Sequence, residues 1–416
     1  MAERDFDVVV FGATSVTGRR VCAYLAQRAE QSGVRWAPAA RDARKVQSVL
    51  GDCGLSPPET IVADVSDAAS LSAMASRARV VLNLVGPYTH YGRPVIDACV
   101  AGGAHYVDLT GEIPFVRRMI DQFDSAAAKA GVKVVQVSGF EALPADLAVL
   151  LAAEAVRARH GEALEQADLE LEVRGLPWPP RASDLVSGGT LQSMAAIAAG
   201  DDQYDFKDPA CLITDSDAAE RVRRASPISV MPRRGVDGSV LAPMQPAAFI
   251  TPAVIHRSAA LRGDAPLRYR EGVRIPGPPA TLPLRLAAAG AVSGSQAAIA
   301  GVASAPAQLR RRLSDGLASV FPSSGFGPAA ERLEGWDWQM IVSGRAGAGR
   351  EARVTVTGEG HPGYLATARM LGEAGLMLAE PGATPDRTGC LTPAAALGTE
   401  QIERFGQARL GFAVSA

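Results

Sequence analysis

A glycine-rich turn near the N-terminus has the residue types and spacing of a phosphate-binding loop. It joins the apolar run "DVVVF" to a helical stretch and reads Gly12-Ala13-Thr14-Ser15-Val16-Thr17-Gly18. Gly12 permits a sharp turn and Gly18 permits close packing of the helix on the sheet, while the helix N-terminus offers unpaired N–H groups and a partial positive charge. The loop therefore predicts a dinucleotide pyrophosphate site.

Ser15 occupies the middle position of this loop, where a glycine normally brings the backbone close to the pyrophosphate. A serine adds a side chain there, but its hydroxyl can donate to a phosphate oxygen, as can those of Thr14 and Thr17. A glycine-rich turn alone is weak evidence. The preceding strand, the following helix and a second strand within about 30 residues favour nucleotide binding over a turn without a ligand.

The end of the second predicted strand indicates which dinucleotide is bound. NAD sites have Asp or Glu there for the ribose 2′-hydroxyl, whereas this strand ends "APAARDARK". Arg41 occupies the ribose position, with Arg44 and Lys45 one helical turn further on, and a guanidinium can hold a 2′-phosphate through two hydrogen bonds. Asp42 is expected to point to the opposite side. These residues favour NADP(H); the alternative is that Arg41 is a solvated residue at a helix start.

Two further segments are expected to touch the same cofactor. Asp64, at the end of "TIVADV", is placed to reach the adenine amino edge. After the fourth strand, "NLVGPYTHYG" brings Val85, Gly86 and Pro87 to the point where the chain passes under the cofactor. Ligands bind outside the carboxyl ends of parallel strands, which is where both segments begin.

Alternating apolar runs and helical stretches position these loops over the first 140 residues. The runs are too apolar on both faces for an exposed antiparallel sheet. Six of them read as strands: "DFDVVVF", "VRWAPAA", "TIVADV", "RVVLNLV", "HYVDLT" and "VKVVQVS". The stretches between them read as helices, among them 18–31, 68–76, 93–101 and 114–130. Alternating β and α units predict an α/β fold with a doubly wound parallel sheet of Rossmann type.

The pattern changes after residue 161. "ADLELEVRG" and "WDWQMIVSGRAGAGREARVTVTGEG" alternate polar with apolar residues at period two, and the second predicts a hairpin turning through Gly344–Gly349. Such strands among proline-rich loops predict a second domain of α+β class with a mostly antiparallel sheet. We expect the NADP-binding domain over 1–140 and a substrate domain over 141–360, which would also provide any homodimer contact.

Composition excludes several classes of function. The chain has 416 residues and a net charge of −2 without a long basic run, so nucleic-acid binding is not expected. Its five cysteines are scattered, with neither a CxxC pair nor a histidine at zinc-ligand spacing, which indicates a reducing compartment and no structural metal. The acidic start "MAERDFD" enters a strand at once, so we expect no signal peptide and a cytoplasmic location.

One uncharged segment leaves two interpretations open. Leu286–Ala305 carries no charge over about the 20 residues that a bilayer span requires, but it consists largely of Ala, Gly and Ser. It is either a small-residue helix packed in or against the core, or a segment making peripheral contact with a membrane or lipid.

Several motifs in fixed order resemble those of the saccharopine dehydrogenase-like oxidoreductases. They are "GATSVTG", "AAR", "NLVGPYTHYG", "HYVDLTGE", "SGF" followed by "LPADL", "SGGT", "HPGYLATARML" and "GCLTPAAALG". Within that group the chain is most similar to the trans-acting enoyl reductases of actinobacterial polyketide-lipid biosynthesis. The resemblance runs from about Phe6 to Gly398 and is weakest from about Asp201 to Val240.

The resemblance implies a Rossmann domain that binds NADP(H), a second domain with a mostly antiparallel sheet, and a C-terminal helical segment, 361–416, that returns to the first domain. It also implies reduction of an α,β-unsaturated thioester on the acyl carrier of a polyketide synthase. Two positions depart from the family pattern: Ser15 replaces a glycine, and Glu141 follows "SGF" where the family often has Asp.

Such a reduction adds hydride at the β-carbon, stabilises an enolate oxygen and protonates the α-carbon. Tyr88, facing the nicotinamide side, is the first candidate donor, with Tyr91 behind it. Glu112 in "DLTGE" and Asp146 in "LPADL" are further candidates, although each can instead be a charge at a helix start that complements the helix dipole. Thr190, after two glycines, is placed either to bind a substrate oxygen or to cap a helix.

Two other functions stay open. One is an imine or carbonyl reductase of saccharopine-dehydrogenase type, which requires cations for amino-acid carboxylates. The other is a non-catalytic cofactor-binding scaffold at lipid surfaces. The uncharged Leu286–Ala305 segment suits an acyl chain better than a zwitterion, so the sequence favours a lipid or polyketide substrate.

Overall fold

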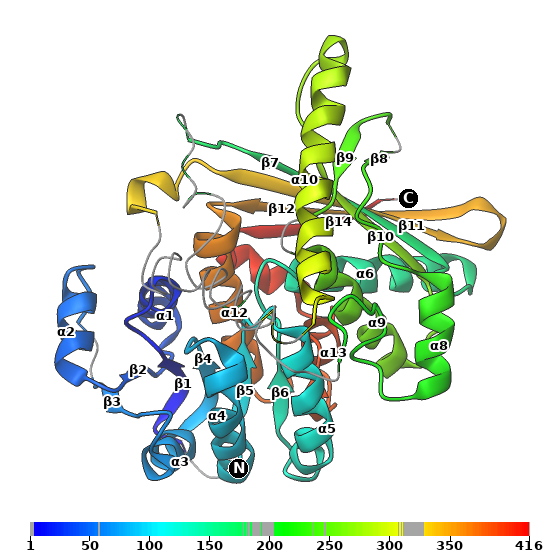
Figure 1. Cartoon of the computed structure of the whole chain (residues 1–416). Coiled ribbons are helices and arrows are strands. Elements are labelled where there is room, and N and C mark those ends of the chain that lie inside the picture. The colour runs from blue at the N-terminus through cyan, green and yellow to red at the C-terminus, as the bar shows by residue number, and fades with distance from the viewer. Residues whose placement is uncertain are drawn as a thin grey trace.

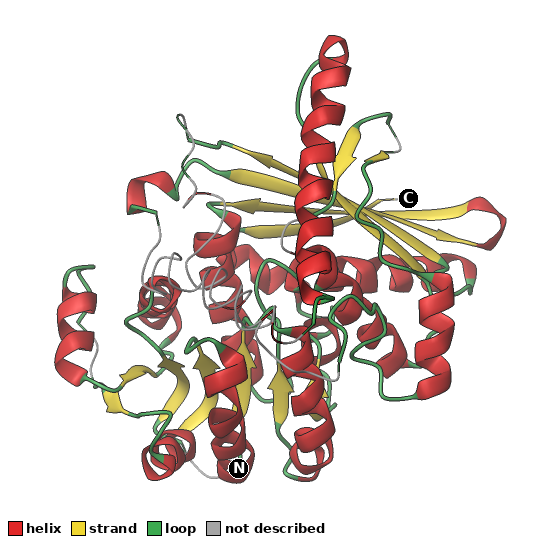
Figure 2. Cartoon of the chain, viewed as in Figure 1, coloured by secondary structure: helices red, strands yellow, loops and turns green. Residues whose placement is uncertain are grey.

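The computed structural model contains two seven-stranded sheets and the helices that pack on them (Figure 1; Figure 2). It describes residues 4–56, 59–177, 204–235, 237–244, 247–306 and 328–415, together with the isolated positions 179, 181, 184, 193, 308 and 310. The "SGGT" motif with Thr190 lies outside the described residues.

The first sheet is parallel throughout and has the order β13-β6-β5-β4-β1-β2-β3. Its strands are β1 (Phe6–Phe11), β2 (Trp36–Ala40), β3 (Ile61–Val62), β4 (Ala78–Asn83), β5 (His105–Asp108), β6 (Lys133–Val135) and β13 (Gly389–Leu391). Its connecting helices are α1 (Val16–Ser32), α2 (Ala43–Gly51), α3 (Ala68–Arg77), α4 (Tyr88–Gly102) and α5 (Ile113–Lys129). The six strands and the doubly wound parallel sheet predicted from the sequence are confirmed.

Strand β1 explains why the parallel sheet forms where it does. Its residues Val8, Val9 and Val10 are all fully buried, so both faces of the strand are covered. β1 pairs with β2 on one side and β4 on the other, so the chain changes direction across the sheet between β1 and β4. A crevice at the carboxyl edge of such a switch point is where doubly wound folds bind ligands.

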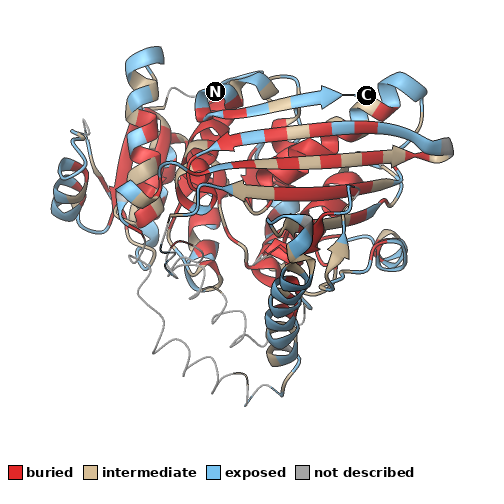
Figure 3. Ribbon diagram, turned by 90° about the horizontal axis from the view of Figure 1, so that it is seen from above, coloured by how far each residue is buried: buried red, intermediate tan, exposed pale blue. Residues whose placement is uncertain are grey.

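The second sheet has the order β14-β12-β11-β7-β10-β9-β8, and only β7 and β10 pair in parallel. Its strands are β7 (Gln166–Arg174), β8 (Arg233–Arg234), β9 (Val240–Ala242), β10 (Arg268–Arg274), β11 (Asp337–Ala346), β12 (Arg350–Glu359) and β14 (Leu410–Ser415). The predicted hairpin is confirmed: β11 and β12 pair from Asp337↔Glu359 to Ala346↔Arg350 around the turn at Gly347–Gly349. Burial alternates along these strands (Figure 3), as the period-two pattern predicts.

Helix α6 (Leu143–His160) lies between the two sheets (Figure 1). Ten of its residues are buried, from Leu143 to Val156, so it is apolar around most of its circumference. It packs closely on the second sheet, because a Cβ placed on Gly344 of β11 would lie 3.1 Å from the Ala152 methyl group. The apolar core thus continues from one sheet to the other.

The C-terminal segment joins both sheets. Helix α12 (Thr367–Ala379) packs on the first domain, where the Tyr24 hydroxyl donates to Glu373 at 2.6 Å. Beyond it, β13 adds a seventh strand to the parallel sheet and β14 forms the outer strand of the other. The predicted helical return to the Rossmann domain is therefore accompanied by two strands that the sequence interpretation did not include.

The uncharged segment forms most of α10 (Leu282–Ala303), which projects from the body of the protein (Figure 1). Ala289 packs against Val240 and Ala242 of β9, whereas Leu284 is 72% exposed. Among the described helices, none has both the length and the hydropathy required to cross a bilayer. The remaining helices include α8 (Ser216–Ala225), α9 (Thr251–Arg262), α13 (Pro393–Leu397) and the short turns Pro362–Ala366 and Ile402–Ala408.

Candidate functional site

The two terminal glycines of the glycine-rich loop are required by its geometry. Gly12 has φ +92°, and a Cβ there would lie 2.9 Å from the carbonyl carbon of Leu84. A Cβ on Gly18 would lie 2.3 Å from the carbonyl oxygen of Gly12. The loop therefore folds tightly between the ends of β1 and β4 and leads directly into the 17-residue helix α1. This arrangement leaves backbone N–H groups at the helix start for an anionic ligand.

Ser15 is compatible with the loop because the backbone at that position is extended. Its φ of −71° and ψ of 164° are open to any residue, so glycine is not required. Its Oγ accepts a hydrogen bond from the Gly18 N–H at 2.9 Å and thereby caps α1. The O–H proton can still donate to a phosphate oxygen, and the neighbouring Thr14 and Thr17 are also partly exposed.

Exposed cations follow β2. Arg41, Arg44 and Lys45 are exposed, whereas the Asp42 carboxylate accepts from the backbone N–H groups of Arg44 at 2.9 Å and Lys45 at 3.2 Å. Asp42 therefore caps α2 and leaves Arg41 as the charged group at the end of the strand. A guanidinium in this position suits a ribose 2′-phosphate.

Asp64 forms a tight turn beyond β3. Its carboxylate accepts from the Ser66 backbone N–H at 2.9 Å and the Ser66 hydroxyl at 2.7 Å. These hydrogen bonds, with the charge of Arg41 as a smaller cause, lower the pKa of Asp64. Arg41 and Asp64 are thus close enough to interact, on the side of the sheet where the adenosine half of a dinucleotide binds.

The segment after β4 lies against the glycine-rich loop. Val85 Cγ2 would be 3.1 Å from a Cβ on Gly12, and the Val85 N–H donates to Asn83 Oδ1 at 3.1 Å. Gly86 is exposed and Pro87 precedes α4. The segment predicted to run beneath the cofactor therefore reaches the nucleotide loop, and the residues present fit a dinucleotide.

The two candidate tyrosines differ in exposure. Tyr88 is buried, with its hydroxyl donating to the Asn83 carbonyl oxygen at 3.1 Å, and burial, followed by the charge of Asp108, raises its pKa well above the usual range. Tyr91 is 41% exposed on α4 and lies beside His90, with ring centroids 6.0 Å apart. Tyr88 can act as a proton donor only after releasing Asn83.

Glu112 is fully buried and caps a helix other than the one it precedes. Its carboxylate accepts from the backbone N–H groups of Tyr88 at 2.9 Å and Thr89 at 2.7 Å, the first residues of α4. It also accepts from the Ser193 hydroxyl at 2.8 Å. The helix-start interpretation of this residue therefore describes its contacts, but the helix is α4 rather than α5.

Asp146 likewise serves a helix distant in sequence. It is buried on α6, and its Oδ2 accepts from the Ala394 N–H of α13 at 2.8 Å. Burial raises the pKa of Asp146 to about 6, although the nearby Ser258 hydroxyl opposes the shift. Asp146 thus ties α6 to the C-terminal segment.

A polar cluster at the ends of β5 and β6 was not among the predicted site residues. Asp108, fully buried, accepts from Tyr106 Oη at 2.8 Å and from the backbone N–H groups of Thr110 and Val137, each at 3.1 Å. Burial raises the pKa of Asp108 to about 7. Val137 has φ +60°, a left-handed conformation that is strained for a β-branched residue. One signal in the sequence could have identified this cluster: a carboxylate directly at the end of an apolar strand.

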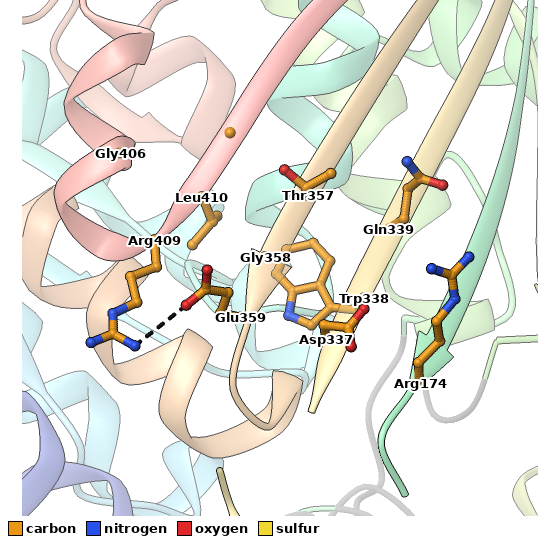
Figure 4. A pocket seen from close by; sticks show the side chains of 11 residues that line it. Arg174, Asp337, Trp338, Gln339, Thr357, Gly358, Glu359, Gly406, Arg409 and Leu410 are labelled. Atoms are coloured by element: carbon orange, nitrogen blue, oxygen red, sulfur yellow. Dashed lines mark hydrogen bonds and ion pairs between the residues drawn. The ribbon is translucent and has the colours of Figure 1, made fainter. Parts of the chain in front are cut away.

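A groove of about 500 Å³ opens at the ends of β7, β11, β12 and β14 (Figure 4). Its charged rim includes Arg174, Asp337, and Glu359 paired with Arg409 at 3.3 Å. Trp338 also lines the groove and packs edge-to-face on Phe140, with ring centroids 4.8 Å apart. The lining residues come from the second sheet and its neighbouring turn, and the charged rim suits a polar ligand. Within the described part of the chain, no cluster of His, Cys, Asp and Glu has the arrangement of a metal site.

Comparison with known proteins agrees with this geometry. Residues 8–135 match the family model for the saccharopine dehydrogenase NADP-binding domain. The chain is 33% identical to a trans-acting enoyl reductase of Mycobacterium tuberculosis, covering 97% of this chain and 96% of the relative. It is 32% identical to a trans-acting enoyl reductase of Mycobacterium ulcerans, covering 100% of this chain and 98% of the relative.

Among solved structures, saccharopine dehydrogenase (L-Glu forming) from Saccharomyces cerevisiae superposes with a TM-score of 0.50 and 16% identity. The match covers 98% of this chain and 99% of that chain. This likeness shows that the two chains share an overall fold.

Proposed function

The chain belongs to the saccharopine dehydrogenase-like family and is an NADP-dependent oxidoreductase, and on this basis we propose that it reduces the C=C bond of an α,β-unsaturated acyl thioester. The observation that carries the proposal is the end-to-end similarity to trans-acting enoyl reductases. An acyl carrier is the proposed source of the thioester, as the word trans-acting in the relatives' names suggests.

The charge at the carboxyl edge of the parallel sheet supports this substrate class. Asp108, Glu112 and Glu141 gather there, close enough for each to influence the pKa of Tyr88. The carboxylate of Glu112, which accepts from two backbone N–H groups, opposes the approach of a substrate carrying carboxylates, such as the amino acids of saccharopine-type reactions. A thioester is neutral and carries no such penalty.

The residues proposed to hold NADP(H) come from four segments. They are the loop 12–18 with its helix N-terminus, Arg41 and Lys45 after β2, Asp64 after β3 beside the adenosine half, and Val85 to Pro87 after β4. When bound, the cofactor supplies the hydride. The chain's own contribution is to hold the acyl group against that cofactor, exclude water and provide a proton.

The experiment is an assay of NADPH oxidation by the purified protein with a short α,β-unsaturated acyl thioester of coenzyme A. We expect oxidation with the unsaturated thioester and none with its saturated counterpart, and deuterium from C4-labelled NADPH should appear at the β-carbon. Oxidation only with an amine plus a keto acid would instead establish imine reduction. Tight NADPH binding without oxidation by either substrate class would indicate a scaffold.

A further inference from the structure

Three carboxyl groups lie at or just beyond the carboxyl ends of β5 and β6, in the half of the sheet that also contains β4. This is the half of a doubly wound sheet over which the nicotinamide end of a dinucleotide binds, because the adenosine half lies over β1, β2 and β3. Two of them already accept several hydrogen bonds. Asp108 accepts from Tyr106, Thr110 and Val137, and Glu112 accepts from the N–H groups at the start of α4. Neither can donate a proton without giving up buried hydrogen bonds.

Glu141 is different. Within the described residues, its carboxylate accepts a hydrogen bond only from its own backbone N–H, and the residue is partly exposed. A Cβ placed on Gly139 would lie 2.5 Å and 2.6 Å from the two carboxylate oxygens, so the glycine makes room for this side chain. The carboxyl group is thus positioned by steric contacts, and not by hydrogen bonds to other described residues.

The backbone around Glu141 is fixed on both sides. The Thr251 hydroxyl donates to the Glu141 carbonyl oxygen at 2.6 Å, and the Phe140 N–H donates to Thr367 Oγ1 at 3.1 Å. Thr251 begins α9 and Thr367 begins α12. Two helices that are distant in sequence therefore hold the loop at Phe140 and Glu141 in position. The strained Val137 precedes it, and such backbone strain persists only where surrounding contacts enforce it.

We propose that Glu141 is the acid that protonates the substrate α-carbon. This inference rests on the proposed function. As hydride from the cofactor forms the C–H bond at the β-carbon, the C=C π-electron pair passes to the α-carbon and carbonyl oxygen. That pair then takes the proton from the Glu141 carboxyl group, which leaves a saturated thioester, NADP⁺ and a Glu141 carboxylate that regains its proton from water.

The electrostatic surroundings suit an acid that works near neutral pH. Burial, followed by the charge of Asp108, raises the pKa of Glu141 to about 7. The other titratable groups that face this loop are Glu112 and Tyr88 from the first domain and, through Thr251, Glu271 of β10. An acid whose pKa lies near the working pH is present in its donating form and is readily reprotonated.

A cofactor-binding experiment tests the placement of Glu141 without any substrate. The dissociation constants of NADP⁺ and NADPH are measured from pH 5.5 to 8.5 for the wild type, Glu141→Gln and Glu141→Asp. An ionised Glu141 near the nicotinamide stabilises the oxidised, positively charged ring. For the wild type, the ratio of the NADP⁺ to the NADPH dissociation constant should therefore fall roughly tenfold as pH rises through about 7. Glu141→Gln should lose this shift and Glu141→Asp should keep most of it. An equal shift in Glu141→Gln would overturn the proposal.

Turnover of the enoyl thioester then tests the proton transfer. Glu141→Gln should lower kcat by about 10²–10⁴-fold with little change in KM, and Glu141→Asp should recover part of the loss. Tyr88→Phe, which removes the other candidate donor, should lower kcat less than Glu141→Gln does; the reverse order would assign protonation to Tyr88. If the wild type reduces no enoyl thioester, the proposed function fails, while the binding experiment still decides where Glu141 lies.

Discussion

The carboxylate of Glu112 accepts a hydrogen bond from the backbone N–H of Thr89 at 2.7 Å, across 23 positions of sequence. It accepts from the Tyr88 N–H as well, so one buried carboxylate satisfies the first two N–H groups of α4. This contact fixes the start of α4, and with it the Val85–Pro87 segment, relative to the end of β5. The glutamate in "DLTGE" therefore positions the cofactor segment from a neighbouring strand.

Replacing Glu112 by glutamine should destabilise the protein by about 2 kcal/mol, because an amide nitrogen then faces buried N–H donors. Urea unfolding followed by far-UV circular dichroism measures the change. Asp42→Ala is the matched control, since Asp42 caps the exposed helix α2 and its loss should cost about 1 kcal/mol. Equal costs for the two variants would show that burial of the Glu112 cap contributes nothing.

Changing Ser15 to glycine should preserve NADPH binding, because the extended backbone at this position suits both residues. Stability should fall by only a few tenths of a kcal/mol in Ser15→Gly and by about 1 kcal/mol in Ser15→Ala, which loses the cap on Gly18. Thermal unfolding and a fluorescence titration with NADPH test both statements. Binding that strengthens more than tenfold in Ser15→Gly would mean that the serine obstructs the pyrophosphate.

Replacing Arg41 by alanine should weaken NADPH binding by about 1–3 kcal/mol and leave NADH binding unchanged, because only NADPH carries the 2′-phosphate. Titration of both nucleotides against both proteins gives the comparison. Arg93→Ala removes an exposed arginine of α4 that lies beside Gln122, and serves as a charge-matched control. A parallel loss of NADPH and NADH affinity in Arg41→Ala would assign the guanidinium to another part of the cofactor.

Alanine should have opposite effects at two helical glycines. A Cβ on Gly372 of α12 would lie 2.4 Å from the Tyr24 ring, so Gly372→Ala should destabilise the protein by about 1–3 kcal/mol. Gly290 of α10 has open space around it, so Gly290→Ala should stabilise it by about 0.5–1 kcal/mol. Chemical denaturation measures both changes, and a stable Gly372→Ala protein would contradict the close packing of α12 on α1.

The Asp146 carboxyl group should make stability depend on pH in a defined direction. Its pKa is raised to about 6 in the folded protein against about 3.9 when unfolded, so the folded state holds the proton more tightly. The protonated group therefore stabilises the folded state fully below about pH 4. As pH rises through about 6, the free energy of unfolding falls by up to roughly 3 kcal/mol.

Subtracting the unfolding free energy of Asp146→Asn from that of wild type at each pH isolates this contribution. The difference cancels other titrating groups, including buried His256, whose pKa is lowered to about 4 by burial and which acts in the opposite sense. A difference that grows with pH between 4 and 6 would contradict the assignment.

The sequence by itself determined six of the seven strands of the parallel sheet, the β11–β12 hairpin and the class of ligand at the first loop. Continuous apolar runs identified β1 to β6, and period-two alternation identified the β11–β12 hairpin. The spacing of apolar residues predicts whether one or both faces of a strand are buried. The roles of Gly12 and Gly18 could also be predicted, because the turn and the helix to which they belong are formed by residues close to them in sequence.

Only the tertiary structure decided what the carboxylates do. Glu112 and Asp146 both carry out helix-start roles, but for α4 and α13, which lie 23 and 248 positions away in sequence. Glu141 differs from them in having no buried N–H donors of another residue within reach among the described positions, and that is a property of how β5, β6, α9 and α12 come together. Local spacing cannot encode such long-range partners, since hydrogen bonding and burial of a side chain are fixed only when distant segments pack.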